Sequence, residues 1–322
     1  MRVAVTGARG RLGRALLQAL EESPFTGPFG PVAWSRPELE LDTLNVEVAA
    51  ALIARDRPEV VIHAAAWTDV DGCARAPDLA LRRNGEAAGA MAEACAAAGV
   101  ELVLVSTNEV FDGRRTDGVG YAPEDPPNPI NPYGESKLAA ERLARAAFTG
   151  VVDTGVAGGR ADGPAPGPRL AIVRTSWLHG PPGNDFPAKI ASAALRAREA
   201  GTSLRVVADE TGSPTYTPDL AEAICELLGA DALAPAGERI AVHHLVNGGR
   251  TSRADWAREV LRATRIEVEV EDVPASTWQR ASTPPRWAVL APTALPSGEP
   301  MREWREAFAD AVPALLRAVG TR

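Results

Sequence analysis

The first half of the chain alternates short apolar runs with longer amphipathic stretches. The apolar runs are rich in β-branched residues and bounded by glycine, proline or charge, which predicts buried strands. These strands are Val3–Thr6, Pro31–Trp34, Glu59–His63 and Glu101–Ser106. The stretches between them repeat apolar residues three and four positions apart, which predicts helices at Arg11–Glu22, Thr43–Arg55 and Pro77–Ala98. Strands that alternate with helices form parallel sheets with helices on both faces, so we predict a doubly wound α/β fold.

The pattern becomes less regular after residue 150. Gly150–Pro168 holds many glycines and prolines and has no apolar period, which predicts a flexible surface loop. The elements expected beyond it are strands at Leu170–Thr175, Leu204–Ala208, Ala241–Val246 and Ile266–Val270, and helices at Asp185–Ala200, Pro218–Leu228, Ser252–Ala263 and Met301–Val319. We therefore expect one domain at residues 1–175 and a smaller, partly interleaved region at 176–322, with about 217–250 packing back onto the first.

Composition narrows the class of protein. The 34 basic and 42 acidic residues give a net charge of −8, which argues against a nucleic-acid partner but not against a small anionic ligand held locally. No apolar run approaches the ~18 residues of a membrane helix, and the N-terminus lacks a signal-peptide pattern. The three cysteines are far apart, and no metal-type spacing is present. We expect a cytoplasmic protein without metal or membrane contact.

Three glycines, Gly7, Gly10 and Gly13, follow the first predicted strand in the segment GARGRLG. A dinucleotide site needs glycines here for a tight turn, for close approach of the backbone to a pyrophosphate and for close packing of helix on strand. A purely structural turn would also use glycine. The position between a strand and a helix favours the dinucleotide interpretation.

The second signal is the pair Tyr133 and Lys137 in YGESK. The chain has only three tyrosines and two lysines, so their separation by four residues at the start of a predicted helix is unusual. Residues four apart share a helix face, so we expect the ammonium group to lie near the phenol and to lower its pKa from ~10. The pair would then supply a proton near neutral pH. The alternative is an ordinary exposed pair.

The third signal is Ser106-Thr107 at the end of the fourth predicted strand. Ligands of open α/β sheets bind beyond the C-terminal strand ends, so a hydroxyl there can donate to a substrate carbonyl. Alone this signal is weak, because serine and threonine often end strands.

Together the motifs GARGRLG, VVIHAAAWTDVDGCARAP, STNEVFDG, NPYGESKLAAE, RTSWLHG and GSPTYTPDLA resemble an extended short-chain dehydrogenase/reductase, specifically the dTDP-4-dehydrorhamnose reductase family. The matches run in family order from residue 1 to about 256. The resemblance implies a Rossmann-type doubly wound parallel sheet. It also implies that a nicotinamide hydride reduces the 4-keto group of a nucleotide-linked 6-deoxyhexose.

The resemblance also implies roles for individual residues. Tyr133 would be the general acid, Lys137 would hold the nicotinamide ribose, and Thr107 would orient the carbonyl. The cofactor contacts carried over are Gly7, Arg9, Gly10, Arg11 and Leu12 at the pyrophosphate, and Ala64, Ala65 and Ala66 at the adenosine and ribose. The expected substrate contacts are Thr68, Val70, Asn108, Glu109, Trp177 and Arg286.

Two segments depart from the family pattern. The usual S-T-D-Y-V-F-D-G has Asn108-Glu109 in place of Asp-Tyr, and the family's tyrosine faces the substrate. An acid at Glu109 suits sugar hydroxyls better than a phosphate. Near the C-terminus, PPRWAVLAPT keeps Arg286 only as a loose match, so the contacts of the nucleotide do not transfer there.

Cofactor preference depends on the end of the second strand. An acidic residue there would bind the ribose diol of NADH, whereas an arginine accepts the 2′-phosphate of NADPH. Ser35 and Arg36 favour NADPH, with NADH as the alternative, and we add Asp42 to the expected cofactor contacts. Arg36 could instead point to solvent.

Three function hypotheses remain open from the sequence. The leading one is an NAD(P)H-dependent 4-ketoreductase. A nucleotide-sugar epimerase with tightly bound NAD and a non-catalytic NADP- or nucleotide-sugar-binding subunit are the alternatives. A homodimer is compatible with each of them. Among other candidates, we interpret His63 as a core residue, His179 as either a substrate contact or a loop residue, and Asp69, Asp71, Glu124 and Asp125 as solvated or capping groups.

Overall fold

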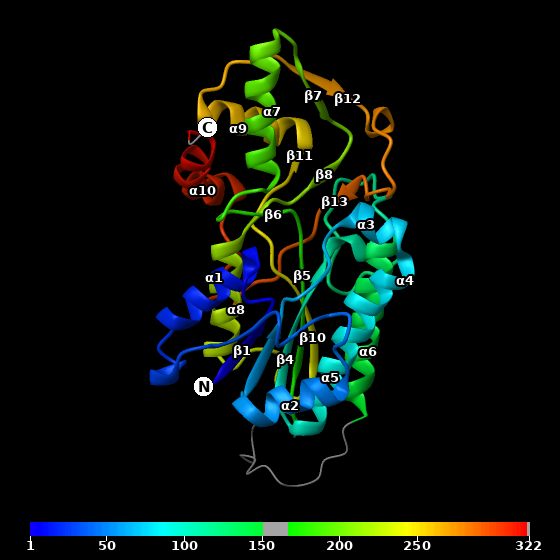
Figure 1. Ribbon diagram of the computed structural model, residues 1–322, viewed down its shortest axis with the longest axis vertical. Coiled ribbons are helices and arrows are strands. Elements are labelled where there is room, and N and C mark those ends of the chain that lie inside the picture. Colours follow the sequence, from blue (N-terminus) through cyan, green and yellow to red (C-terminus); the bar gives the residue numbers. More distant parts are fainter. Residues whose placement is uncertain (151–166, 321–322) are drawn as a thin grey trace.

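The structure is a computed structural model that describes residues 1–150 and 167–320. The loop predicted at Gly150–Pro168 therefore lies, apart from its ends, outside the described residues. Figure 1 shows a large sheet with helices on both faces and a second group of elements beyond one end of it.

Six parallel strands form the central sheet, in the order β10-β5-β4-β3-β1-β2. Their bounds are β1 Val3–Thr6, β2 Val32–Trp34, β3 Val60–His63, β4 Glu101–Thr107, β5 Leu170–Thr175 and β10 Ile240–His244. The predicted doubly wound α/β fold is confirmed. The chain leaves β1 toward β2 and returns past β1 to β3, so the strand order reverses between β1 and β3. Ligands of such sheets bind at this reversal, beyond the carboxyl ends of the strands.

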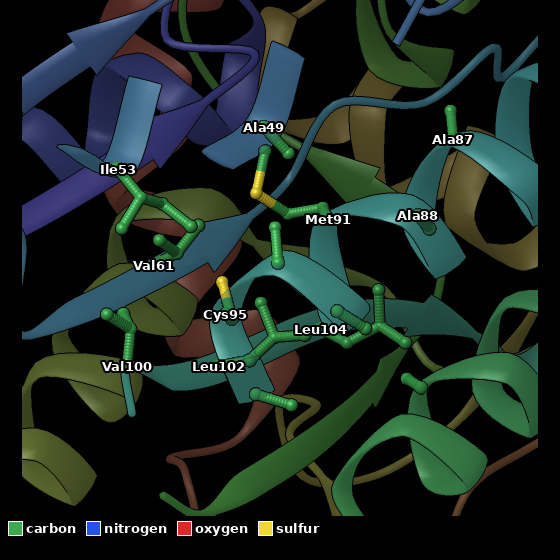
Figure 2. Packing of buried hydrophobic residues seen from close by; sticks show 14 of the residues in the cluster. Ala49, Ile53, Val61, Ala87, Ala88, Met91, Cys95, Val100, Leu102 and Leu104 are labelled. Carbon is green, nitrogen blue, oxygen red and sulfur yellow. The ribbon is translucent and has the colours of Figure 1, made fainter. Parts of the chain in front are cut away.

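Alternate residues of each strand pack on opposite faces of the sheet. On one face, Val3 and Val5 contact the helices α1 (Arg11–Glu22) and α8 (Thr217–Gly229). On the other face, Ala4 lies under α2 (Val46–Asp56), α5 (Ala87–Ala98) and α6 (Pro132–Thr149). Figure 2 shows this second core, in which Met91 and Cys95 of α5 pack among side chains of α2, β3 and β4.

The helix predicted at Pro77–Ala98 is divided in the structure. It consists of α4 (Pro77–Ala80), a π-helical segment at Leu81–Glu86, and α5, and it is preceded by a short helix α3 (Val70–Arg75) that the sequence pattern did not predict. Two glycines in this region allow close packing, because a Cβ at Gly89 would lie 2.8 Å from the Leu143 side chain and one at Gly85 would lie 3.3 Å from the Ala139 Cβ. Helix α6 can therefore lie directly against α5, which fixes its N-terminus beside β4.

The second group of elements packs around a separate aromatic core of Trp256, Trp304 and Phe308. Its helices are α7 (Phe186–Ala200), α9 (Arg253–Thr264) and α10 (Trp304–Gly320). Its strands are β6 (Leu178–His179), β7 (Leu204–Val207), β8 (Thr211–Gly212), β9 (Thr215–Tyr216), β11 (Thr251–Ser252), β12 (Val270–Val273) and β13 (Trp287–Ala288). They form three small sheets, β11-β8-β13, β12-β7 and β6-β9.

The strand predicted at Ile266–Val270 is wrong in its bounds. Helix α9 ends at Arg265 in a left-handed conformation, and the next residue, Ile266, is buried in the aromatic core instead of pairing with a strand. The strand begins at Val270 and runs parallel to β7. An apolar residue that follows a helix end can either pack in a core or pair within a strand, and the apolar periodicity does not distinguish these two cases.

The chain crosses between the two groups of elements more than once. After β5 it enters the second group, then returns to the central sheet to form α8 on α1 and β10 beside β5, with Val242 opposite Ile172. It then leaves again for α9 and α10. These crossings bring residues from both halves of the sequence to the carboxyl end of the sheet.

Candidate active site

The glycine turn after β1 has no room for side chains. Gly7 has a φ of +66°, and a Cβ there would lie 2.9 Å from Ala65 Cα. A Cβ at Gly13 would lie 2.2 Å from the Gly7 carbonyl oxygen, and the Gly10 N–H donates to that same oxygen at 2.8 Å. Because glycine has no Cβ, the backbones of β1, α1 and the segment after β3 can pack in direct contact at these positions.

The turn fits a dinucleotide. Gly10 is the N-cap of α1, with no side-chain cap and no acidic residue in the first turn. The first N–H groups of the helix thus have no side-chain acceptor and carry the positive end of the helix dipole, which is the arrangement that binds pyrophosphate. Ala64, Ala65 and Ala66 are half-buried beside the turn, and the Ala65 N–H donates to Thr6 Oγ1 at 3.1 Å.

Of the three other residues predicted at the pyrophosphate, Arg11 and Leu12 are already engaged through their side chains. Arg11 donates to the Gly180 carbonyl and to Asn184 Oδ1 (2.9 Å), and pairs with Asp185 at 3.0 Å. The Leu12 side chain is buried in the core. Their contribution to an anion site would therefore come from the main-chain N–H groups, whereas the exposed Arg9 side chain lies at the turn itself.

Replacing Gly13 with alanine is expected to abolish cofactor binding, because the new methyl group would overlap the Gly7 carbonyl and force the turn open. Overpacking of this kind costs about 1–3 kcal/mol of stability. Isothermal titration with NADPH and a thermal melt measure the two effects. Gly27→Ala is a useful comparison, since a Cβ at Gly27 would contact no atom within 4 Å and its φ of +68° tests backbone strain alone. Unchanged NADPH affinity in Gly13→Ala would contradict the assignment of the turn.

The residues after β2 differ in whether their side chains are exposed or already bound to another residue. Arg36 is exposed, and the Ser35 carbonyl accepts from the Glu38 N–H at 3.0 Å in a turn. The Asp42 carboxylate accepts two hydrogen bonds from Arg83, at 2.6 and 2.7 Å, which lower the pKa of Asp42. Asp42 is therefore held by Arg83, and Arg36 is the cation that stands open to a ligand.

Thr107, Tyr133 and Lys137 lie together at the carboxyl end of β4. Asn131 caps α6 by accepting the Gly134 N–H at 2.8 Å, and this cap places Tyr133 in the first turn beside Thr107. The Thr107 hydroxyl lies close enough to the Tyr133 phenol to lower its pKa. Lys137 is 3% exposed and donates from Nζ to the Val105 carbonyl at 2.7 Å. The structure thus brings together all three residues predicted to be catalytic.

The predicted electrostatics of the pair are wrong in direction. Burial and the nearby Glu109 carboxylate raise the pKa of Tyr133, with the Thr107 hydrogen bond opposing them. Burial lowers the pKa of Lys137 to about 8, although Glu141 favours its charged form. The reason is geometric: the ammonium group binds a main-chain carbonyl of β4 instead of the phenol. Tyr133 is accordingly held in its protonated, proton-donating form.

Ser106 does not join the site. Its hydroxyl donates to Glu141 Oε1 at 2.6 Å, and Glu141 forms a fully buried pair with Arg174 at 2.8 Å. Successive strand residues face opposite sides, so of the predicted pair only Thr107 can reach a ligand. The buried pair instead ties α6 to β5.

The expected substrate contacts are only partly brought together. Glu109 is half-buried, and its Oε2 accepts from Asn131 Nδ2 at 2.7 Å, whereas Asn108 is 4% exposed and turned into the protein. Thr68 is exposed just after the alanines, and Val70 is half-buried at the start of α3. No contact among these residues shows what they would bind.

Trp177 is fixed in an unusual conformation. Its φ is +43°, its ring stacks on Trp256 with centroids 5.8 Å apart, and the Arg253 guanidinium lies 3.5 Å above it. A Cβ at Gly212 would lie 2.5 Å from the ring, so only glycine fits on that side. The Trp177 ring is therefore fixed in position, and the Arg253 guanidinium stacks on its face.

A cleft of about 630 Å³ lies in the second group of elements, and its charge is mostly positive. It is lined by the basic residues Lys189, Arg205, Arg253, Arg280 and Arg286, by the acid Glu210, and by Trp278 and other apolar residues. Arg286 is exposed and pairs loosely with Asp209 at 3.5 Å. Burial lowers the pKa of Arg253 to about 10, against the opposing effect of Glu210. A cleft of this size and sign suits a polyanionic small molecule.

Sequence reasoning missed most of this cleft. Arg253, Arg280 and Lys189 lie in separate elements of the chain. Arginine is so common in the sequence that no single arginine indicates a binding site. Asn131 was available as a helix cap signal, but its second contact, from Nδ2 to the Thr283 carbonyl at 3.1 Å, joins residues 152 positions apart.

Of the remaining candidates, His63 and Asp71 have structural partners, whereas His179 is buried in β6 and neither of its ring nitrogens has a hydrogen-bond partner in the described structure. His63 shares a hydrogen bond of 3.1 Å with Thr6, and burial lowers its pKa to about 3, so it is neutral. Asp71 accepts the Ser282 N–H at 3.0 Å and pairs with Arg280 at 3.4 Å. Within the described ranges, no cluster of three or more His, Cys, Asp or Glu side chains could hold a metal ion. None of the described helices has the length and apolar character needed to cross a membrane.

Comparison with known proteins identifies relatives over nearly the whole chain. The family model described as RmlD substrate binding domain matches residues 1–317. The dTDP-4-dehydrorhamnose reductase of Streptomyces griseus is 34% identical, covering 98% of this chain and 94% of the relative. Among solved structures, the dTDP-4-dehydrorhamnose reductase of Clostridium acetobutylicum has a TM-score of 0.80 at 27% identity (98% and 99% covered). That of Bacillus anthracis, in complex with NADP, has a TM-score of 0.78 at 29% identity (96% and 98% covered).

Proposed function

The chain belongs to the RmlD substrate binding domain family, and from that premise we propose that it is an NADPH-dependent reductase of the 4-keto group of a nucleotide-activated 6-deoxyhexose. The observation that carries the proposal is the cluster of Thr107, Tyr133 and Lys137 at the sheet end next to the glycine turn. The basic cleft supports it, because a sugar nucleotide carries its negative charge on the diphosphate.

The chemistry divides between the cofactor and the protein. NADPH supplies the hydride that reduces the carbonyl carbon. Tyr133 donates its phenolic proton to the carbonyl oxygen, so that the ketone becomes a secondary alcohol, and the phenolate regains a proton from solvent. Thr107, whose hydroxyl lies near the Tyr133 phenol, orients the same oxygen. Because the pKa of Tyr133 is raised, the residue holds its proton at neutral pH until the oxygen develops negative charge.

The cofactor fits the turn and the residues around it. The main-chain N–H groups of Arg11 and Leu12 would hold the pyrophosphate, Gly7 and Gly10 would let it approach the backbone, Ala64 to Ala66 would border the adenosine, and Lys137 would hold the nicotinamide ribose. Arg36 would bind the 2′-phosphate. Asp42 is the weakest member of the set, since Arg83 already occupies its carboxylate.

Arg36→Ala is expected to raise KM for NADPH about tenfold and to leave KM for NADH nearly unchanged, because only NADPH carries the phosphate that the guanidinium would bind. Steady-state kinetics with each cofactor measure the change, and NADH serves as the internal control. An equal loss with both cofactors, or no loss with NADPH, would show that Arg36 points to solvent.

The function itself is tested with purified protein, NADPH and a panel of nucleotide-linked 4-keto-6-deoxyhexoses, including the dTDP form. Consumption of the nicotinamide absorbance with appearance of the 4-hydroxy sugar supports the proposal. Absence of turnover on the whole panel would overturn it. Oxidised cofactor that co-purifies and is not consumed would favour the epimerase hypothesis instead.

We also propose how the chain is organised and where it works. Residues 1–175 would form the cofactor domain and 176–322 the substrate region, with about 217–250 belonging structurally to the first, in keeping with the packing of α8 and β10 on the central sheet. NADPH and nucleotide sugars are made in the cytoplasm, which favours that location. A homodimer is testable by light scattering.

A further inference from the structure

A carboxylate lies beside the proton donor of the site and has no part in the mechanism described above. Glu109 follows Thr107 by two residues, in the short 3-10 turn that ends β4. Its Oε2 accepts from Asn131 Nδ2 at 2.7 Å, and Asn131 is also the N-cap of the helix that carries Tyr133. One asparagine therefore fixes Glu109 and Tyr133 relative to each other.

The backbone is equally constrained at this position. A Cβ at Gly134 would lie 2.1 Å from the Glu109 carbonyl oxygen, so the turn and the first turn of α6 are in direct contact. The Glu109 N–H donates to Thr107 Oγ1 at 3.2 Å. The Glu109 backbone is thus fixed, and its carboxylate is held by the one hydrogen bond from Asn131.

The second oxygen of this carboxylate remains open. Glu109 Oε1 makes no hydrogen bond or ion pair within residues 1–150 and 167–320, and the side chain is half-buried. The charged and titratable groups that act on it are Tyr133 on α6, Arg253 on α9, Arg280 on the segment after β12, Glu210 after β7 and Cys73 on α3. Asn131 Nδ2 donates to Glu109 and also, at 3.1 Å, to the carbonyl of Thr283, which lines the cleft, so Glu109 lies next to the cleft.

A carboxylate can only accept hydrogen bonds, which restricts its ligand. A phosphate would be repelled, and an additional cation is disfavoured because Arg253 and Arg280 already act on Glu109. A neutral hydroxyl group fits best. In a 4-keto-6-deoxyhexose the carbons next to the carbonyl are C3 and C5, and C5 carries only the ring oxygen and the methyl group. The hydroxyl next to the reacting carbonyl is therefore the one on C3.

We propose that Glu109 is a specificity-determining residue whose Oε1 accepts a hydrogen bond from the C3 hydroxyl of the substrate. The proposal rests on the proposed function and goes beyond it, because it names a substituent that the substrate must carry. The family's usual tyrosine at this position can both donate and accept, so it would tolerate an ether or an absent hydroxyl. Glu109 makes this chain more selective for a substrate with a free C3 hydroxyl, since loss of that donor leaves a half-buried carboxylate oxygen without a partner.

The test compares kcat/KM for a dTDP-4-keto-6-deoxyhexose that has a free C3 hydroxyl with kcat/KM for its 3-deoxy and 3-O-methyl analogues. We expect the wild type to prefer the free hydroxyl by about 100-fold, because the lost partner is a charged acceptor. Glu109→Ala should reduce the preference below about tenfold. Glu109→Gln keeps the shape and can still accept from Asn131, but then turns its NH₂ group to the substrate, so its preference should also fall.

Two controls separate this role from a structural one. Glu135→Gln, on the exposed side of the first turn of α6, should keep the wild-type preference. NADPH affinity and melting temperature of Glu109→Gln should match the wild type. An unchanged preference in Glu109→Ala would overturn the proposal while leaving the reductase function standing, whereas no turnover by the wild type would overturn the function itself. A 3-amino substrate that is turned over faster than the 3-hydroxyl one would also overturn it, in favour of an ammonium ligand.

Discussion

Replacing Tyr133 with phenylalanine is expected to lower kcat by about 10²–10⁴ while leaving NADPH affinity within about twofold. The hydroxyl is the only part removed, and it is the group that gives its proton to the carbonyl oxygen. Tyr133 is half-buried, and burial and Glu109 raise its pKa, so its hydroxyl is protonated at neutral pH and available as the donor. Stopped-flow and steady-state turnover, together with titration of NADPH, measure the two quantities.

The other tyrosines provide the control for this variant. Tyr216→Phe removes a phenol on β9 for which the described structure shows no side-chain hydrogen bond, so its kcat should remain near the wild-type value. A Tyr133→Phe protein that still turns over at more than a tenth of the wild-type rate would show that proton donation comes from another group. Glu109 would then be the first candidate, since its carboxyl group lies close enough to raise the pKa of Tyr133.

Replacing Lys137 with methionine is expected to reduce kcat/KM by about 10²–10³, with part of the loss in NADPH affinity. Methionine fills a similar volume but removes the ammonium group and its bond to the Val105 carbonyl, which leaves a strand carbonyl unpaired in the interior. It also removes the cation that would hold the nicotinamide ribose. Kinetics as a function of NADPH concentration separate the binding loss from the chemical one.

Lys189→Met is the matched comparison, because Lys189 is the only other lysine in the chain. Lys189 lines the basic cleft, so its loss should raise KM for the sugar nucleotide and leave NADPH affinity unchanged. If both variants weaken NADPH binding equally, Lys137 has no special place at the cofactor. If Lys137→Met binds NADPH and turns over normally, the ammonium group is structural.

The fold was predictable because its signals are local. The four strands of the first half and α1 follow from runs of apolar residues between glycine, proline and charge, and these match the structure closely. The catalytic cluster was also predictable, since Tyr133 and Lys137 are close in sequence and rare in composition. Their electrostatics were not, because the direction of the Lys137 side chain depends on a carbonyl of β4, 32 residues away.

The substrate side was much less visible from the sequence. The cleft is assembled from α7, β7, α9 and the segment after β12, and none of these carries a motif that identifies its partner. Asn108 illustrates the limit, since it was expected at the substrate beside Glu109 but is buried, while Glu109 is half-buried. Neighbours in a tight turn point in different directions, and only the backbone conformation decides which one reaches the ligand.

Arg11 bonds to the segment around Gly180 and Asp185, and it thereby connects the proposed cofactor site with the proposed sugar-nucleotide site. Arg11 belongs to the turn at the cofactor, and Asp185 is the N-cap of α7, the helix that supplies Lys189 to the cleft. Arg11 therefore connects the glycine turn directly to the helix that lines the cleft. Linkage requires that, when a sugar nucleotide bound at α7 changes the affinity for the cofactor by some factor, the bound cofactor changes the affinity for the sugar nucleotide by the same factor.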